Sequence, residues 1–181
     1  MREILANLLS AASSSVLVLN QYLQTNQPKL ITNSGVETPN MTFEPNTEVY
    51  GSCGFLGHDQ RFYILGGFTQ RQQISVVDGC NVSRVGTLPF TLQFGSCAKI
   101  GSSTFVACFD SSSSKSLAKT CYKTSDPLGE WEVLPSSQYQ HRGIQIAATN
   151  NEILAVGGLW PSHSKTESLR LDLPSCTKFM N

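Results

Sequence analysis

Three stretches of this chain can be laid over one another, and this internal repeat is the strongest constraint on its fold. They are GSCGFLGHDQRFYILGG, GSCAKIGSSTFVACF and GIQIAATNNEILAVGG, at positions 51–67, 95–109 and 143–158. Each reads as a strand, a short polar turn and a second apolar strand. The second strands end 42 and 49 residues apart, at positions 67, 109 and 158. Self-similarity with a period of about 20 to 50 residues is typical of repeat folds, and this spacing is that of propeller blades.

Further strands are predicted after each of these pairs. Third strands are expected at QISVVDGC, KTCYKT and ESLRLDL (73–80, 119–124 and 167–173) from their alternation of apolar and polar residues. Fourth strands are expected at VSRVGTLP and EWEVLP (82–89 and 130–135), which both end in Leu-Pro. A proline is tolerated at a strand end because its missing N–H breaks no ladder there. We therefore predict an all-β propeller segment of about three to four four-stranded antiparallel blades, with an incomplete ring.

The repeat divides the chain within a single domain. We expect a partial blade at 16–42, full blades at 43–90 and 91–137, and a partial blade at 138–181. Residues 1–15 contain an apolar stretch followed by small residues, so we expect either a cleaved signal peptide, a short amphipathic helix or a misplaced start. Because propellers have about four to eight blades, the chain is either a fragment, or completes its ring with a second copy, or arranges its sheets in some other way.

The span KTSDPLGEWEVLP (123–135) is predicted to contain the turn that connects the third and fourth strands of one unit. Asp126-Pro127-Leu128-Gly129 has the residues that start a β-turn and supply its positive φ angle. Trp131 follows on the fourth strand. Large aromatic side chains at regular strand positions are usually core, so we expect Trp131 to pack between neighbouring blades.

The double glycines carry a family resemblance. Ile64-Leu65-Gly66-Gly67 and Ala155-Val156-Gly157-Gly158 resemble kelch repeats, whose blades have a glycine pair after an apolar second strand. The basic residue before Gly143, and Trp131, are also similar to the kelch pattern, whereas the middle unit has Cys108-Phe109 in place of the glycines. The resemblance covers about residues 43–173. It implies a divergent kelch-like propeller in which Gly66, Gly67, Gly157, Gly158 and Trp131 are structural, and which binds other proteins through its loops.

Composition argues against several classes of function. Thirteen basic and thirteen acidic residues balance, and they are scattered, so no basic stripe is present for nucleic acid. No apolar run is long enough to span a bilayer. The three histidines, His58, His141 and His163, read as turn or solvated residues rather than ligands. With no nucleophile or phosphate-binding motif either, we predict that the chain is not an enzyme and has no cofactor and no metal site.

Two enzyme families provide an alternative interpretation. Thr124-x-Asp126…Gly129-x-Trp131 is similar to the Asp box of sialidase-type propellers, and kelch-type blades also occur in galactose oxidase. The first activity needs an arginine cluster that grips a carboxylate, and the second needs two histidines and tyrosines around copper. Neither set is evident in the chain. A propeller enzyme fragment with an incomplete active site therefore stays as the alternative to a binding module.

The cysteines and sequons bear on localisation. Six cysteines, the sequons at Asn40 and Asn81 and the candidate signal peptide favour an extracellular protein with glycans and disulfides. Cys108 and Cys121 lie on adjacent antiparallel strands, so we predict a disulfide between them. Cys53 and Cys97 share one position in two GSC motifs, where we expect small buried residues near the axis. The alternative is an intracellular kelch adaptor with reduced thiols.

The predicted binding face consists of three loops. They are residues 58–61, 68–71 and 160–165, and their candidate contact residues are His58, Arg61, Phe68, Arg71, Trp160 and His163. Loops between rigid strands are where such folds place their contacts. Phe68 and Trp160 occupy matching positions just after the double glycines, where an exposed aromatic side chain would serve as an anchor. The sequence thus predicts a non-catalytic interaction module for a protein or glycan partner.

Overall fold

The computed structural model of the chain describes residues 40–111, 117–141, 143–149 and 152–156 with their side chains. The backbone alone is described for residues 4–10, 13–19, 29–32, 35–37 and 166–170. Strands dominate these residues, and the helical element among them is the single 3₁₀ turn η1 (Leu117–Lys119). None of the helical structure in this part of the chain is long and apolar enough to cross a membrane. The all-β prediction is confirmed.

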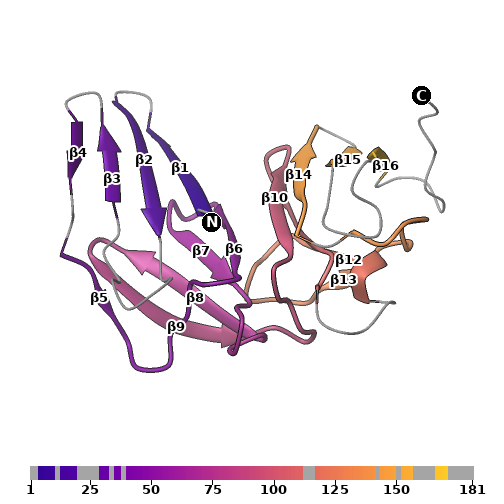
Figure 1. Cartoon of the computed structure of the whole chain (residues 1–181), viewed down its shortest axis with the longest axis horizontal. Coiled ribbons are helices and arrows are strands. Elements are labelled where there is room, and N and C mark those ends of the chain that lie inside the picture. Colours follow the sequence, from indigo (N-terminus) through magenta and orange to yellow (C-terminus); the bar gives the residue numbers. More distant parts are fainter. Residues whose placement is uncertain are drawn as a thin grey trace.

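The strands form four sheets, which follow one another in chain order (Figure 1). The first contains β1 (Ile4–Ser10), β2 (Ser13–Leu19), β3 (Lys29–Thr32) and β4 (Gly35–Glu37). The second contains β6 (Cys53–Leu56), β7 (Phe62–Leu65), β8 (Gln73–Asp78) and β9 (Asn81–Thr87), with β5 (Thr42–Phe43) parallel to β9 at its outer edge.

The third sheet contains β10 (Ser96–Ile100), β11 (Thr104–Cys108), β12 (Cys121–Thr124) and β13 (Glu132–Val133). The fourth contains β14 (Gln145–Ala148), β15 (Glu152–Val156) and β16 (Thr166–Arg170). Apart from β5, every strand pairs antiparallel with its neighbour in sequence. Each repeat unit predicted from the sequence is therefore one antiparallel meander.

The N-terminal segment corrects one expectation. Residues 4–10 form strand β1 rather than a short helix, and β1 pairs with β2 at every position from Ile4↔Leu19 to Ser10↔Ser13. A single short helix is marginal in water, whereas pairing with β2 gives partners to backbone groups of both strands. The unit expected as a partial blade at 16–42 thus belongs to a complete four-stranded sheet that begins at Ile4.

The first strands of successive sheets contact one another. β1 contacts β6, β6 contacts β10, and β10 contacts β14. One apolar cluster fills the space between the second and third sheets, where the Phe55 and Phe105 rings stack with centroids 4.5 Å apart. Another cluster lies between the third and fourth sheets and includes Phe109 and Ile153. The second, third and fourth sheets therefore pack face to face, and the sheets that the structure describes do not form a closed ring.

Trp131 lies at the edge of the cluster between the second and third sheets. Its indole packs edge-on against Phe90, with ring centroids 5.4 Å apart, and Phe90 stacks on Tyr122 at 3.6 Å. The Trp131 Nε1–H donates a hydrogen bond to the Pro127 carbonyl oxygen at 3.3 Å, so the ring closes over the turn that precedes it. The side chain thus joins the β12–β13 turn to the core.

Two disulfides join strands of the described residues. The predicted bridge between Cys108 and Cys121 is present and joins β11 to β12 within the third sheet. A second bridge was not predicted: Cys53 on β6 pairs with Cys97 on β10, with Cα atoms 5.5 Å apart. The sequence indicated only small buried residues at these two positions. Equivalent positions in two repeats meet because the first strands of consecutive sheets lie against each other. Cys80, by contrast, is exposed and has no disulfide partner among the described residues.

Replacing Ser75 by alanine is expected to stabilise the protein. Ser75 lies on β8 with 0% of its surface exposed, and within the described residues its Oγ has no hydrogen-bond partner. A buried hydroxyl without a partner costs about 1 to 3 kcal/mol, so Ser75→Ala should raise the free energy of unfolding by about 1 kcal/mol. Urea denaturation followed by circular dichroism measures the change.

Ser96→Ala is the matched control for this substitution. Ser96 is also buried, but its Oγ accepts a hydrogen bond from the Ile146 N–H at 3.1 Å and so connects β10 to β14. Loss of this hydrogen bond should lower the free energy of unfolding by about 1 kcal/mol, because the Ile146 N–H is left unpaired. A loss of stability in Ser75→Ala similar to that in Ser96→Ala would contradict the interpretation of Ser75.

Candidate functional site

The candidate site is built on the loop between β7 and β8, residues 66–72, which begins with the first double glycine. Gly66 has φ +68° and Gly67 has φ +154°, values that favour glycine over residues with side chains. A Cβ atom at Gly66 would overlap the carbonyl oxygen of Leu92. The chain can therefore turn here, and pass close to the segment before β10, only because residue 66 has no side chain.

Backbone hydrogen bonds attach the loop to its surroundings on two sides. The Gly67 N–H donates to the Leu92 carbonyl oxygen at 3.0 Å, and the Phe68 N–H donates to that of Tyr50 at 2.8 Å. In return, the Leu92 N–H donates to the Arg71 carbonyl oxygen at 2.8 Å. The Gln93 Nε2 group adds a bond of 3.3 Å to the Phe68 carbonyl oxygen.

The carboxylate of Glu48 holds the tip of the loop. Its Oε2 atom accepts hydrogen bonds from the Thr69 N–H at 2.6 Å, the Thr69 hydroxyl at 3.0 Å and the Gln70 N–H at 2.8 Å. Hydrogen bonds to an ionised carboxylate are stronger than those between neutral groups. This set of bonds makes the loop a rigid platform rather than a flexible tip.

Gln73 fixes the base of the same loop. Its side chain is 1% exposed, and its Nε2 group donates to the carbonyl oxygens of Glu48 and, at 2.8 Å, of Gly66. Its Oε1 atom accepts a hydrogen bond from the Glu48 N–H at 3.1 Å. One buried amide thus positions both the residue that holds the loop and the glycine that begins it.

Three aromatic rings gather over this platform, and we call Tyr50, Phe68 and Phe94 the aromatic cluster. Their centroids lie 5.3 to 5.8 Å apart, with tilted and edge-to-face contacts. Phe68 is 45% exposed, whereas the other two rings are half-buried. Arg71 is exposed next to them, and its Nε–H donates to the Phe68 carbonyl oxygen at 3.4 Å. The cluster is an apolar surface with one cation at its margin.

The structure separates the residues predicted to form one binding face. His58 and Arg61 lie in the β6–β7 turn, whereas Phe68 and Arg71 lie in the β7–β8 loop. Because β6, β7 and β8 form an antiparallel meander, these two connections are at opposite ends of β7. The remaining predicted residues, namely Gly157, Gly158, Trp160 and His163, lie outside the described residues. The two predicted glycosylation sites, Asn40 and Asn81, are both exposed.

The β6–β7 turn has its own polar network. The Asp59 carboxylate accepts hydrogen bonds from the Arg61 Nε–H at 2.6 Å and the Tyr63 hydroxyl at 2.9 Å. Slight burial acts to raise the pKa of Asp59, but the hydrogen bonds from Arg61 and Tyr63 outweigh it and lower this pKa. Burial, and then the bond to Asp59, raise the pKa of Tyr63. Arg61 therefore stabilises its own turn.

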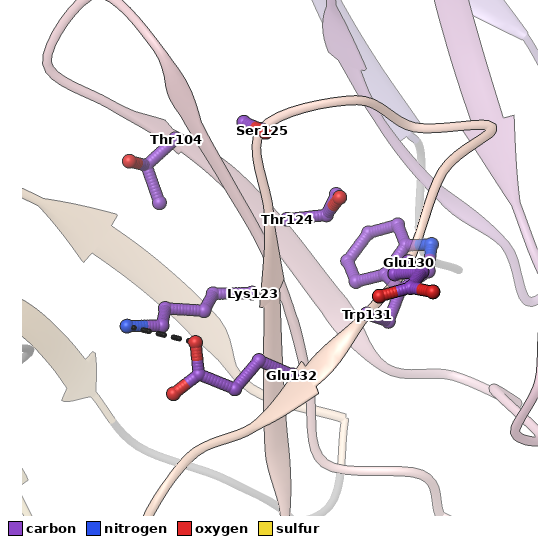
Figure 2. Close-up of a pocket in the computed structure, with 7 residues that line it drawn as sticks. All are labelled: Thr104, Lys123, Thr124, Ser125, Glu130, Trp131 and Glu132. Atoms are coloured by element: carbon purple, nitrogen blue, oxygen red, sulfur yellow. Dashed lines mark ion pairs between the residues drawn. The ribbon is translucent and has the colours of Figure 1, made fainter.

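A pocket of about 610 Å³ lies at the end of the third sheet, where the β10–β11 and β12–β13 turns are found (Figure 2). It is lined by Thr104, Lys123, Thr124, Ser125, Glu130, Trp131 and Glu132. The Lys123 Nζ and Glu132 Oε2 atoms form an ion pair at 3.2 Å. Within the described part of the chain, no group of three or more histidine, cysteine or acidic side chains could hold a metal ion.

Sequence reasoning missed several of these residues. Tyr50 and Phe94 lie outside recognisable motifs, and Glu48 is separated from Thr69 by 21 residues, so no local pattern could have joined them. Of the residues that line the pocket, the sequence singled out Trp131 and Thr124, and it indicated both only as parts of a structural turn motif. The other lining residues look like ordinary strand and turn residues.

Comparison with known proteins adds no family. No model of a protein family matches the chain, and no curated protein is significantly similar to it. The contacts and exposure of its own side chains must therefore carry any functional argument.

Proposed function

We propose that this chain is a non-catalytic protein-interaction module with kelch-like blades, and that it binds a partner protein through the aromatic cluster. The observation that carries the proposal is the 45% exposure of Phe68 on a loop fixed by Glu48 and by backbone bonds. Covering such a ring yields up to about 3 kcal/mol. Because the loop is already ordered, little of this gain is lost to conformational entropy on binding.

The composition of the cluster supports a protein partner. Aromatic and arginine side chains are the residues that most often dominate the energy of protein interfaces, and here Phe68 and Arg71 are exposed side by side. The rings of Tyr50 and Phe94 pack against the Phe68 ring, and these contacts restrict its orientation. A rigid aromatic side chain with a neighbouring cation provides both contact area and a polar contact at the margin of an interface.

The architecture that we propose for the module is radial. The contacts between β1, β6, β10 and β14 support an arrangement in which each sheet is a blade and the first strands lie nearest the axis. A second copy of the chain could complete such a ring. The two disulfides are compatible with an extracellular protein, and we propose this location for it.

The aromatic cluster is tested by Phe68→Ser. Wild-type protein is screened against an array of extracellular domains, and the dissociation constant of each captured domain is measured by biolayer interferometry. We expect Phe68→Ser to weaken binding at least about thirtyfold, as for an interface residue that contributes about 2 kcal/mol. Its thermal midpoint should fall by no more than about 4 °C, because only the ring contacts with Tyr50 and Phe94 are lost. The bonds that hold the loop come from the backbone and from Glu48, Thr69 and Gln93.

Leu128→Ser is the matched control. Leu128 is equally exposed, at 47%, but lies in the β12–β13 turn. It should leave the affinity unchanged. Binding partners that Phe68→Ser retains at wild-type affinity would contradict the proposal, and so would an array in which nothing binds.

A further inference from the structure

The pocket at the end of the third sheet has a lining that the proposed function does not use. In Figure 2, Trp131 and Glu130 lie on one side of β12, whereas Thr104 and the Lys123–Glu132 ion pair lie on the other. Its volume of about 610 Å³ is within the range of small-molecule sites, which is about 300 to 1,000 Å³.

Some of the polar groups around the pocket already form hydrogen bonds within the β12–β13 turn. The Thr124 hydroxyl donates to the Asp126 carbonyl oxygen at 2.7 Å and accepts from the Asp126 N–H at 3.1 Å. The indole N–H of Trp131 is bonded to Pro127. These bonds, together with the packing of Trp131 on Phe90, fix the position of the indole ring. The aromatic surface of the pocket is therefore held in place without a ligand.

Other polar groups are available. Within the described residues, the side chains of Thr104, Ser125 and Glu130 make no hydrogen bond or ion pair. The two hydroxyls can each donate and accept, and the Glu130 carboxylate can accept several hydrogen bonds. Glu130 is exposed, so its use by a ligand requires no rearrangement of the core. These groups line the same pocket as the Trp131 ring.

The charges restrict the class of ligand. Glu132 already neutralises Lys123, and Glu130 adds a negative charge, so the described residues that line the pocket provide no free cation for a phosphate or a carboxylate. A pyranose ring matches the remaining groups, which are an aromatic ring, hydroxyls and a carboxylate. One of its faces carries C–H groups that can lie on an indole, and its hydroxyls are both donors and acceptors, like those of Thr104 and Ser125.

We propose that this pocket binds a neutral saccharide unit, with Trp131 as the apolar platform and Glu130 as the principal hydrogen-bond acceptor. The site is distinct from the aromatic cluster: it belongs to the third sheet, whereas Phe68 belongs to the second. The module would then recognise a glycan and a protein surface at separate places.

The test is a fluorescence titration with the methyl glycosides of glucose, galactose, mannose and N-acetylglucosamine. The chain has two tryptophans, so a Trp160→Phe background leaves Trp131 as the single reporter. We expect a saturable change with at least one glycoside, and a dissociation constant that rises about tenfold or more in Glu130→Gln. A charged acceptor lost from a hydrogen bond accounts for that change. Phe68→Ser should bind the glycoside as the wild type does, which separates this site from the proposed protein interface.

Asp78→Asn is the matched control, because Asp78 is an exposed carboxylate at the end of β8 and does not line the pocket. It should leave the titration unchanged. Tetramethylammonium serves as a competing probe, since an aromatic ring beside a carboxylate could also hold a cation. Saturation by tetramethylammonium alone would overturn the proposal. Absence of saturation with every glycoside, or an unchanged affinity in Glu130→Gln, would overturn it too.

Discussion

Replacing Cys53 and Cys97 by serine is expected to lower the free energy of unfolding by about 4 kcal/mol, the largest loss that we predict for this protein. The bridge joins residues 44 positions apart, and in the chain-entropy description a cross-link of that span restricts the unfolded chain by about 4 kcal/mol. The bridge between Cys108 and Cys121 spans 13 positions, for which the same description gives about 3 kcal/mol. The first bridge also connects two sheets, whereas the second lies within one.

Urea denaturation of the two double-serine variants, without reductant, measures these losses. A non-reducing peptide map of the wild type must first show the 53–97 and 108–121 cross-links. Cys80→Ser is the control, because Cys80 is exposed and forms no disulfide within the part of the chain that the structure describes, and it should change the stability by less than about 0.5 kcal/mol. Free thiols at positions 53 and 97, or a smaller loss than for the 108–121 variant, would contradict the assignment.

The second large effect is expected for Gly66→Ala, which should cost about 3 kcal/mol or more. The φ angle of +68° alone costs an alanine about 1 to 2 kcal/mol. In addition, the new Cβ would overlap the carbonyl oxygen of Leu92, which is backbone and cannot rotate away. Relieving the overlap would separate the β7–β8 loop from the segment before β10 and break the hydrogen bond between Gly67 and Leu92.

Gly79→Ala separates the two contributions. Gly79 has φ +57°, but a Cβ atom there would meet nothing within 4 Å. In this variant the free energy of unfolding should fall only by the cost of the positive φ angle, about 1 kcal/mol. Thermal and urea denaturation of both variants give the comparison. Equal losses would show that the close approach of Leu92 is not what requires a glycine at position 66.

The positions of most strands could be predicted from the sequence. Alternation of apolar and polar residues is a local property with a period of two, so 73–80 was recognisable as the strand that became β8. The bridge between Cys108 and Cys121 followed from the same logic, because strands that follow one another in the chain usually pair. The segment ILANLLS lacks this alternation, and β1 was therefore missed.

Within the candidate site, Phe68 and Trp131 could be singled out from the sequence, but their surroundings could not. Phe68 was visible because it follows a glycine pair, and Trp131 because it follows a turn. Glu48, which holds the loop of Phe68, has no local signal, because its hydrogen bonds reach 21 and 22 residues along the chain. Side chains that act on distant segments look like ordinary surface residues until the chain is folded.

What the sequence by itself determined was the repeating β-meander, since each strand and each turn depends on residues close together in the chain. Only the tertiary structure decided that Cys53 meets Cys97, and that Tyr50, Phe68 and Phe94 form one cluster. It also placed His58 and Arg61 at the opposite end of β7 from Phe68. The physical reason is that these contacts depend on how sheets pack against one another, which no local pattern of residues records.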